Sequence, residues 1–484
     1  MHERLTLRKT KIVATIGPAC DDPGILKAMI EAGMNVARLN LSHGDFNEHA
    51  RRLERVRRAA GDAGVLVATM IDTRGMEVRS GTLASESVEL DAGDSFRLYA
   101  DRHPGTAEGV TVSYPALIHE LEPGARVMID DGQIELLAEE YEDGALRCRV
   151  VVGGTLRARK SINVPDSRIS LGFDDPETLR ILRGELQFAA SQEVDYIAAS
   201  FIQGAADVQA IRSLLREFDA RIPIIAKIES RDGVNHLEAI VEAANGTMVA
   251  RGDLGVELPL AEVPGSQKKI IYTTVYNGKP VITATQMLDS MERNPRPTRA
   301  EASDVANAIL DGSSAVMLSG ETAMGKYPVE SVRTMAALAL KAESYLKDYG
   351  HLQKSQPNPT NRVTEAVSQA AVSMAGSLGA AAIISLTTSG FTSRLISKHR
   401  PDCPILAITE SPLSARRLSI NWGVAPLQCP AGLRDRDKID FAIARGVDAG
   451  YLLEGDLVVA TAGYHERPGT TDQIRVIKVD LDNG

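Results

Sequence analysis

Acidic and basic side chains suited to phosphate chemistry follow short apolar runs in this chain. Lys227 and Glu229 stand two apart in the segment IIAKIES, so they lie on the same side if the segment is a strand. Asp253 follows the next apolar run, in the glycine-containing segment ARGDLG. Two protein carboxylates, completed by water and substrate oxygens, are the usual way to hold Mg²⁺. Either carboxylate alone would suit a surface salt bridge, but both at the ends of consecutive runs, with a lysine between them, favour a Mg²⁺ site.

Two further runs in the first third of the chain end in cations and oxygen donors. At these ends the sequence places Arg38, Asn40, Ser42 and His43, and then Asp72, Thr73, Glu77 and Arg79. Arginine suits phosphate because its guanidinium donates two parallel hydrogen bonds. The oxygen donors could hold a cation or cap helices, and capping is the safer interpretation for Ser42 and Thr73. His43 could likewise be a turn residue.

Two later segments suit a substrate carboxylate. Arg251, Gly252 and Asp253 precede a turn or helix start, where free backbone N–H groups attract anions. Thr285, after the run VITA, is in position to donate a hydroxyl. The segment from Thr298 predicts instead a helix start in which Glu301 completes the cap, and no catalytic role is assigned to it.

All these residues depend on apolar runs of the buried-strand type. The runs are Lys11–Ile16, Asn35–Leu39, Val65–Ile71, Tyr196–Ser200, Pro223–Ile228, Gly246–Ala250, Pro280–Ala284 and Ser314–Leu318. Near-continuous apolar strands that alternate with helices predict a parallel sheet covered on both faces. Eight of them predict an α/β fold of the closed (β/α)8 TIM-barrel type, whose catalytic residues come from the C-terminal ends of the strands.

The interval between the third and fourth runs is far longer than one helix requires. Over residues 81–163 apolar and polar residues alternate, and Asp-Gly and Gly-Gly turns punctuate them. The pattern predicts a small antiparallel β-barrel inserted on the catalytic face, where a lid belongs. The large barrel then comprises residues 1–80 and 164–345.

A third region, residues 346–484, begins with the Pro-containing connector KSQPNPTN. It carries strand-like runs at Ala382–Leu386, Ile405–Thr409 and Leu457–Thr461, with helical stretches such as Thr364–Leu378. This alternation predicts a separate open α/β domain.

Composition narrows the function classes. Lys and Arg number 54 against 64 Asp and Glu, and the net charge of −10 disfavours non-specific nucleic-acid binding. The four cysteines show no CxxC pairing, which argues against a zinc site or a disulfide framework. The segment Met1–Lys11 lacks the apolar core of a signal peptide, and no apolar run approaches the roughly 20 residues of a membrane helix. We therefore expect a cytoplasmic protein without membrane or nucleic-acid partners.

The ordered segments KTKIVATIGPA, GMNVARLNLSHG, MVARGDLGVELP and GKPVITATQML, with the long segment PRPTRAEASDVANAILDGSSAVMLSGETAMGKYPVE, resemble the pyruvate kinase family. The resemblance implies that Arg38 and Arg79 bind a transferring phosphoryl group and that Lys227 neutralises charge on it and on an enolate oxygen. It implies Mg²⁺ or Mn²⁺ at Glu229 and Asp253. The implied substrate-binding and catalytic residues are Arg38, Arg79, Ser200, Lys227, Ala250, Arg251, Gly252, Asp253 and Thr285.

The resemblance also implies a potassium ion and a nucleotide. Glu77 stands where potassium-dependent members carry Glu and potassium-independent members carry Lys, so we expect potassium dependence. The implied K⁺ ligands are Asn40, Ser42, Asp72 and Thr73. The implied ADP or ATP contacts are His43, Arg79, Lys160 and Asn163.

The segment TTSGFTSRLISKHRPDCPILAIT resembles the family's sugar-phosphate effector loop. A phosphate there would be surrounded by hydroxyls and backbone N–H groups of Thr387, Thr388, Ser389, Gly390 and Thr392. An ordinary Ser/Thr-rich loop is the alternative. The later segment AGYHERPGTTDQ lacks the family's usual aromatic and serine pattern, so the effector, a sugar phosphate or a nucleotide, stays open. A homotetramer is also implied.

Six residues depart from the family pattern on loops near the substrate or nucleotide. They are Arg74, Met76, Ser161, Asp166, Gln203 and Gly204. None of these changes removes Lys227, Arg38 or the metal carboxylates, so the core chemistry should survive.

The sequence therefore predicts an allosterically controlled glycolytic enzyme that makes pyruvate and ATP from phosphoenolpyruvate and ADP. One alternative is a sugar-phosphate sensor in which catalysis has weakened. Another is a metal-dependent barrel enzyme that acts on pyruvate enolates, such as an aldolase, which would not need Lys227 with two phosphate arginines. Phosphoryl transfer to ADP separates the first hypothesis from both alternatives.

Overall fold

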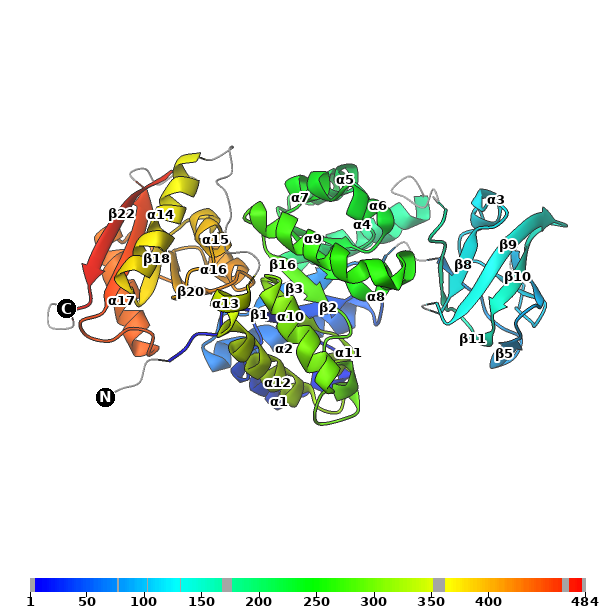
Figure 1. Ribbon diagram of the computed structural model, residues 1–484, viewed down its shortest axis with the longest axis horizontal. Helices are drawn as coiled ribbons and strands as arrows, with labels where there is room; N and C mark the ends of the chain where they lie inside the picture. The colour runs from blue at the N-terminus through cyan, green and yellow to red at the C-terminus, as the bar shows by residue number, and fades with distance from the viewer. Residues whose placement is uncertain are drawn as a thin grey trace.

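The computed structural model describes residues 5–75, 78–101, 103–130, 132–167, 176–350, 362–463 and 470–480. They form three bodies in a row: a C-terminal α/β domain, a central barrel and a β domain at the opposite end (Figure 1). No helix among these residues combines the length and apolar character needed to cross a lipid bilayer.

The central body is a closed barrel of parallel strands, as predicted. Its strands are β1 (Lys11–Thr15), β2 (Val36–Asn40), β3 (Ala68–Asp72), β13 (Tyr196–Ala199), β14 (Ile224–Ile228), β15 (Gly246–Ala250), β16 (Val281–Ala284) and β17 (Ala315–Leu318). Each overlaps one of the predicted apolar runs. Strand β1 pairs with both β2 and β17, which closes the sheet.

Helices cover the outside of the barrel. They are α1 (Pro23–Glu31), α2 (Phe46–Ala63), α4 (Pro176–Ser191), α5 (Ala205–Glu217), α6 (Arg231–Asn235), α7 (Leu237–Ala243), α8 (Arg251–Glu257), α9 (Val263–Tyr276), α10 (Arg299–Leu310), α11 (Gly320–Ala323), α12 (Pro328–Glu343) and α13 (Leu346–Tyr349). The predicted cap is confirmed, because Thr298 and Glu301 form a reciprocal capping box at the start of α10.

The barrel interior is packed with buried apolar side chains. Val13, Met70, Met248 and Met317 belong to one cluster there, and Ile420 of the C-terminal domain joins it. The Tyr196 hydroxyl donates to the carbonyl of Arg417 at 2.5 Å. The C-terminal domain therefore packs against the end of the barrel away from the catalytic face.

The inserted segment is a small, mostly antiparallel β domain. Its strands are β4 (Val78–Arg79), β5 (Ser87–Leu90), β6 (Ser95–Tyr99), β7 (Gly109–Thr111), β8 (Arg126–Ile129), β9 (Ile134–Glu142), β10 (Ala145–Val152), β11 (Gly154–Arg157) and β12 (Ser161–Asn163), with the helix α3 (Leu117–Glu120). The pair β6–β7 is parallel. Edge strands β4 and β7 meet where Gly81 N donates to Thr111 O at 2.7 Å and Ser113 N to Arg79 O at 2.8 Å. These bonds close the sheet on itself.

The C-terminal domain is an open sheet flanked by helices. Strands β18 (Ala382–Leu386), β19 (Ile405–Thr409), β20 (Val424–Gln428), β21 (Leu457–Gly463) and β22 (Thr471–Lys478) lie in the order β20-β19-β18-β21-β22, and only β22 is antiparallel to its neighbour. The helices are α14 (Arg362–Leu378), α15 (Phe391–Lys398), α16 (Pro412–Leu418) and α17 (Asp435–Asp448). The sequence prediction missed β20 and β22, which are the two edges.

Candidate active site

Lys227 stands at the centre of a buried ion cluster at the C-terminal end of β14. Its Nζ lies 2.8 Å from Glu229 Oε1 and 3.1 Å from Asp72 Oδ1. It also donates to Ser200 Oγ at 2.7 Å. The side chains of Asp72 and Glu229 are each 1% exposed, so these charges interact at low dielectric. The structure thus brings together four of the predicted residues, Asp72, Ser200, Lys227 and Glu229.

The surroundings of Lys227 raise its pKa above the ordinary value. Burial alone would lower the pKa, but the carboxylates of Asp72, Glu229 and Asp253 outweigh burial and the charge of Arg38. The amine is therefore charged at neutral pH. A cation held in this way can neutralise developing negative charge but cannot act as a base.

Glu229 shares its carboxylate between two donors. Oε1 pairs with Lys227, and Oε2 accepts the backbone N–H of Phe201 at 2.5 Å. Burial raises the pKa of Glu229 to about 7, with the charge of Lys227 opposing the rise and that of Asp253 adding to it. Phe201 adopts φ of 53°, a left-handed conformation that costs a non-glycine residue about 1–3 kcal/mol. No residue pattern marks Phe201 in advance, because it contributes a backbone N–H group.

The residues present fit a divalent cation between Glu229 and Asp253. The negative charge of Asp253 raises the pKa of Glu229, so the two carboxylates repel each other and a cation would relieve that repulsion. Among the described residues, no group of three or more His, Cys, Asp or Glu side chains is placed to hold a metal. Water and substrate oxygens would complete the coordination, as is usual for Mg²⁺.

Asp72 connects Arg38 to Lys227. Arg38 Nε donates to Asp72 Oδ2 at 2.6 Å, while the other oxygen of Asp72 pairs with Lys227. Burial alone would raise the pKa of Asp72, but Arg38 and Lys227 together lower it below the ordinary value. Arg38 Nη1 also donates to Thr15 Oγ1 at 2.8 Å, a contact that the sequence reasoning did not anticipate. The carboxylate fixes two cations beside each other.

The first turn of α8 meets Thr285 at the ends of the neighbouring strands β15 and β16. Gly252 N donates to Thr285 Oγ1 at 2.8 Å, and that hydroxyl donates to Ala284 O at 2.7 Å. Asp253 lies in the same turn, directly after Ala250 ends β15 and Arg251 begins α8. The predicted carboxylate-binding backbone and Thr285 are therefore adjacent.

The side chain of Arg251 supports the Thr285 turn. Its Nη2 donates to the carbonyls of Thr285 at 2.6 Å and Gln286 at 3.1 Å, and its Nη1 pairs with Asp304 at 2.6 Å. Thr285 and Gln286 have φ of 67° and 51°, so this turn is left-handed without glycine. The sequence reasoning expected only the backbone of Arg251 to act, and it missed Asp304.

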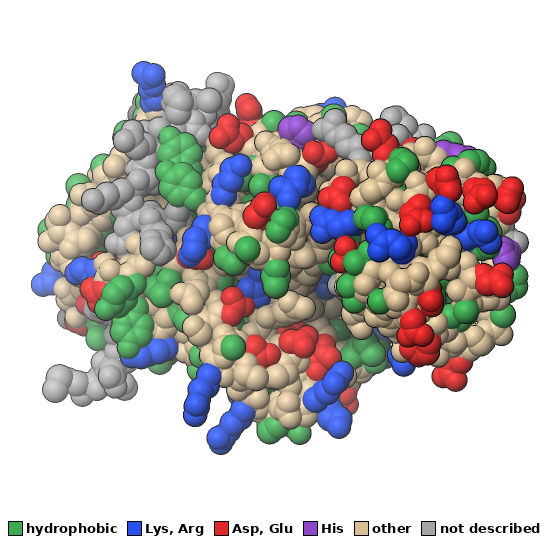
Figure 2. All heavy atoms as spheres, turned by 45° about the vertical axis from the view of Figure 1, so that its right-hand side comes forward, with side chains coloured by type: hydrophobic (Ala, Val, Ile, Leu, Met, Phe, Trp, Pro, Cys, Tyr) green, Lys and Arg blue, Asp and Glu red, His purple; other side chains and the backbone are tan. Residues whose placement is uncertain are grey.

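The predicted nucleotide residues lie mainly on the β domain. Arg79 donates to the Arg159 carbonyl at 2.9 Å, and Lys160 pairs with Asp130 at 2.8 Å, and both of these contacts lie within the β domain. Asn163 Nδ2 donates to Glu257 Oε1 at 3.1 Å, which connects the β domain to α8. His43 is exposed, and its carbonyl lies 2.7 Å from His49 Nε2. Acidic and basic side chains are interspersed on the face where the barrel meets this domain (Figure 2).

The predicted potassium ligands are only partly grouped. Asn40 and Asp72 are paired across β2 and β3, and Thr73 follows directly. Asn40 Oδ1 accepts the Ser42 N–H at 3.1 Å, a local turn contact, and Ser42 is exposed. Both oxygens of Asp72 already pair with cationic side chains. Glu77, on which the potassium prediction depends, lies outside the described residues.

The predicted effector loop connects β18 to α15. Gly390, with φ of 79°, precedes the helix, and its N–H donates to Thr387 Oγ1 at 2.9 Å. The carbonyl of Thr388 accepts from Ser414 at 2.8 Å and that of Ser389 from Arg394 at 3.1 Å. Thr392 is buried, and its hydroxyl lies 2.6 Å from that of Thr471. Gly469, in the later loop, lies outside the described residues.

Several departures from the family pattern have local partners. Arg74 Nε donates to Leu41 O at 2.6 Å and lies 3.3 Å from Glu185. Asp166 forms a two-pronged pair with Arg126 at 2.8 and 2.9 Å. The backbone N–H groups of Gln203 and Gly204 both donate to Asp207 at the start of α5. Ser161 begins β12, and Met76 lies outside the described residues.

Comparison with known proteins identifies the family of the chain. Residues 7–332 match the family model described as pyruvate kinase, barrel domain, and residues 365–477 match pyruvate kinase, alpha/beta domain. A pyruvate kinase of Geobacillus stearothermophilus is 46% identical over 98% of this chain and 80% of its own length. Pyruvate kinases of Bacillus licheniformis and Clostridium acetobutylicum are 44% and 41% identical over 98% of this chain, and over 81% and 100% of their own lengths. The chain belongs to the pyruvate kinase family of phosphotransferases.

Proposed function

We propose that this chain transfers the phosphoryl group of phosphoenolpyruvate to ADP, giving pyruvate and ATP in the last step of glycolysis. The observation that carries the proposal is the charged amine of Lys227, fixed by Asp72 and Glu229 at the catalytic end of the barrel. Phosphoryl transfer needs little covalent work from a protein and depends mainly on positioning and charge neutralisation. A permanently charged, buried lysine beside Arg38 meets that need.

The substrate's two anionic ends find separate partners in this arrangement. The carboxylate would bind at the first turn of α8, where Ala250 to Asp253 present backbone groups beside Thr285. The phosphoryl group would bind at Arg38 and Lys227, which Asp72 holds together. Ser200 accepts a hydrogen bond from Lys227 and so helps to orient the amine. The carboxylate and the phosphoryl group are thereby held on opposite sides of the enol.

Glu229 and Asp253 would hold Mg²⁺ or Mn²⁺, which supplies positive charge next to the phosphoryl and enolate oxygens when it is bound. As the phosphoryl group leaves, Lys227 stabilises the negative charge that develops on the enolate oxygen. The methylene carbon then takes a proton on the side where Thr285 lies. Conversion of the enol to the ketone is strongly downhill and draws the transfer toward ATP.

The β domain would act as the lid over the nucleotide. Lys160 and Asn163 sit near its junction with the barrel, and the contact of Asn163 with Glu257 would transmit lid movement to α8. Arg79 donates to a carbonyl within this domain and would reach the phosphoryl group when the lid closes. His43 would contact the nucleotide from the barrel side. Closure would exclude water from the ion cluster.

We also propose potassium dependence, with Asn40, Ser42, Asp72 and Thr73 as ligands. The pairing of Asn40 with Asp72 across adjacent strands supports the position of such a site. A phosphorylated metabolite would bind the loop Thr387–Gly390 with Thr392 and regulate the enzyme. The family resemblance supports a homotetramer, and the charged segment Met1–Lys11 supports a cytoplasmic location.

Pyruvate formation from phosphoenolpyruvate and ADP tests this proposal. With Mg²⁺ present, the assay should be run in potassium, in sodium, and with a large inert cation in place of both. Strong turnover in potassium that collapses in the other salts is the expected result. Equal turnover in every salt would support the proposed reaction and reject the potassium site. Absence of turnover from folded protein loaded with Mg²⁺ would reject the proposal and favour the sensor alternative.

A further inference from the structure

A single peptide group at the end of β3 links the ion cluster to helix α4. This group, which we call the β3-end peptide, joins Thr73 to Arg74 directly after Asp72 ends the strand. Its carbonyl, on Thr73, accepts the Ser200 hydroxyl at 2.8 Å. Its N–H, on Arg74, is shared between the two carboxyl oxygens of Glu185 at 3.2 and 3.4 Å. The two ends of one planar unit are therefore held from two different elements of the barrel.

The Ser200 hydroxyl connects this peptide to Lys227. A hydroxyl carries one proton, and the Thr73 carbonyl at 2.8 Å accepts it in preference to Asp72 Oδ1 at 3.4 Å. The lone pairs of Ser200 Oγ are then left for Lys227 Nζ, which donates to them at 2.7 Å. The orientation of the Ser200 hydroxyl therefore depends on the β3-end peptide, and the position of the Lys227 amine depends on that hydroxyl.

Glu185 is part of the barrel wall and not of the protein surface. Its side chain lies on α4 and is 1% exposed. Its Oε1 also lies 3.3 Å from Arg74 Nε, and that nitrogen donates to the Leu41 carbonyl at 2.6 Å. Burial raises the pKa of Glu185 to about 8, with the charge of Arg74 opposing the rise and that of Asp72 adding to it. Both the carboxylate and the protonated acid offer an acceptor oxygen to the peptide N–H, so either form can hold it.

The residue after the β3-end peptide is packed just as closely. Gly75 lies against the ring of Phe201, and a Cβ at this position would overlap that ring. Only glycine allows the backbone to approach another group so closely. The backbone N–H of Phe201 in turn donates to Glu229 Oε2 at 2.5 Å. The β3-end peptide thus lies between two contacts that limit its rotation, one to Glu185 and one to Phe201.

We propose that Glu185 is a positioning residue for phosphoryl transfer and acts on Lys227 through the β3-end peptide and Ser200. The inference rests on the proposed function, because it gives Glu185 a part in the same reaction. While Glu185 holds the peptide, the Ser200 hydroxyl donates away from the amine and keeps its oxygen toward it. Without Glu185 the peptide can rotate, and the hydroxyl can donate to Asp72 Oδ1, the oxygen that pairs with Lys227. The amine would then be less well placed to meet the charge that develops on the enolate oxygen.

Pyruvate formation by variants of the full chain tests the inference. Glu185→Met removes the acceptor at similar side-chain length. We expect its kcat to fall about tenfold with a smaller change in KM for phosphoenolpyruvate, because Lys227 acts on charge that develops during transfer. Glu185→Gln keeps an acceptor oxygen and should stay within about threefold of the wild-type kcat. Glu177→Met, at a 62% exposed side chain on the same helix, is the matched control and should leave kcat unchanged.

A double-mutant cycle with Ser200→Ala distinguishes positioning from a merely structural role. If Glu185 acts through Ser200, then Glu185→Met should lower kcat by less than about twofold once Ser200 is replaced. Ser200→Ala alone should lower kcat at least as much as Glu185→Met does in the wild-type background. The unfolding free energies of the same four proteins give a second coupling that needs no turnover. We expect the double variant to lose less stability than the sum of the two single losses.

Three kinetic results would overturn the inference. Equal losses of kcat from Glu185→Met with and without Ser200 would show that Glu185 does not act through this hydroxyl. A loss in Glu185→Gln as large as that in Glu185→Met would show that the acceptor oxygen is not what matters. A near-normal kcat in Ser200→Ala would remove the route, even if Glu185→Met did not fold.

Failure of the proposed function would look different from failure of this inference. Folded wild-type protein would then make no pyruvate, and the coupling in unfolding free energy would decide alone. Additive stability losses in Glu185→Met and Ser200→Ala would overturn the connection between the two residues, and non-additive losses would support it.

Discussion

The ion cluster around Lys227 and the junction between the barrel and the C-terminal domain both bury basic side chains. The two regions differ in the partners of these side chains and in the direction in which their pKa values shift. At the catalytic end, Lys227 and Arg38 each touch a buried carboxylate, and carboxylates raise the pKa of Lys227. At the junction, burial lowers the pKa of Lys11 to about 7 and that of Arg400 to about 9, with Glu343 only partly opposing.

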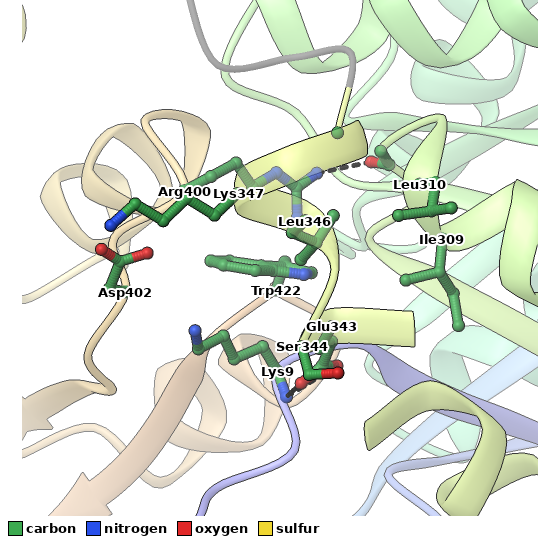
Figure 3. Close-up of a pocket in the computed structure, with 12 residues that line it drawn as sticks. Lys9, Ile309, Leu310, Glu343, Ser344, Leu346, Lys347, Arg400, Asp402 and Trp422 are labelled. Carbon is green, nitrogen blue, oxygen red and sulfur yellow. Dashed lines mark hydrogen bonds between the residues drawn. The ribbon is translucent and has the colours of Figure 1, made fainter. Parts of the chain in front are cut away.

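The difference separates cations that buried carboxylates hold from cations that carbonyl oxygens and an aromatic ring hold (Arg400 in Figure 3). Asp72 and Glu229 fix the catalytic cations in place before any substrate arrives, which is the preorganisation that phosphoryl transfer exploits. The junction cations rely on carbonyls and an aromatic face. Charge deletion in the ion cluster around Lys227 should therefore change activity, and the stability of the junction should depend on pH.

The largest expected effect comes from removing the central catalytic cation. Lys227→Met should lower kcat for pyruvate formation by about a thousandfold, because the enolate charge loses its fixed neutralising partner. The buried carboxylates of Asp72 and Glu229 would also lose a partner, so the unfolding temperature should fall. Steady-state kinetics and thermal unfolding measure the two effects.

Lys27→Met is the matched control for that variant. Lys27 is exposed and pairs only loosely with Glu31 at 3.9 Å, so both activity and stability should be retained. A near-normal kcat in Lys227→Met would contradict the claim that the charge of Lys227 is needed for catalysis.

A smaller loss is expected from the residue that holds the Thr285 turn. Arg251→Gln removes the hydrogen bonds to the carbonyls of Thr285 and Gln286, so the left-handed turn should relax. We expect kcat to fall by about tenfold to a hundredfold with a smaller change in KM for phosphoenolpyruvate. Arg293→Gln, an exposed neighbour, is the control, and equal losses in both variants would reject a positioning role for Arg251.

We expect the buried amine of Lys11 at the junction to make the unfolding free energy depend on pH. Burial lowers the pKa of Lys11 from 10.5 to about 7, so between these values the unfolded chain binds one proton more than the folded chain. Stability of the wild type relative to Lys11→Met should therefore rise with pH across this window, by at most about 1.4 kcal/mol per pH unit.

Urea unfolding of the wild type and Lys11→Met, from neutral to moderately alkaline pH, checks whether the stability difference rises with pH. The variant also loses the hydrogen bond from Lys11 to the Val424 carbonyl, which adds a constant offset but no slope. A difference in unfolding free energy that stays flat with pH would show that Lys11 keeps its ordinary pKa.

The smallest effect should come from an exposed ion pair in the lid. Asp166 and Arg126 are both 41% exposed, so Asp166→Asn should change the unfolding free energy by less than about 1 kcal/mol. Chemical unfolding measures it, and a loss of several kcal/mol would mean that exposure is a poor guide to the strength of ion pairs in this protein.

The barrel could be predicted because each strand is buried on both faces and therefore reads as a continuous apolar run. The edge strands β20 and β22 of the C-terminal domain could not be predicted in this way. Strand β20 contains Pro426, and β22, with the sequence TDQIRVIK, is largely polar and partly exposed. Edge strands face solvent on one side, so neither has to be apolar throughout.

The same distinction applies to the site. Lys227, Glu229 and Asp253 were predictable because parallel strands bring their C-terminal ends to one face. Phe201 and Thr15 were not, since Phe201 offers a backbone N–H, and the hydroxyl of Thr15 meets Arg38 only through the register of β1 with β2. The positions of Arg79 and Lys160 depend on lid orientation, which no local pattern specifies.

The most direct test of the account is ³¹P NMR of wild-type protein and Lys227→Met incubated with phosphoenolpyruvate, ADP, Mg²⁺ and potassium. The account predicts that the wild type converts the phosphoenolpyruvate resonance into those of ATP, with pyruvate formed in equal amount, and that Lys227→Met does so at least about a hundredfold more slowly. Release of inorganic phosphate without ATP, or equal rates in the two proteins, would contradict it.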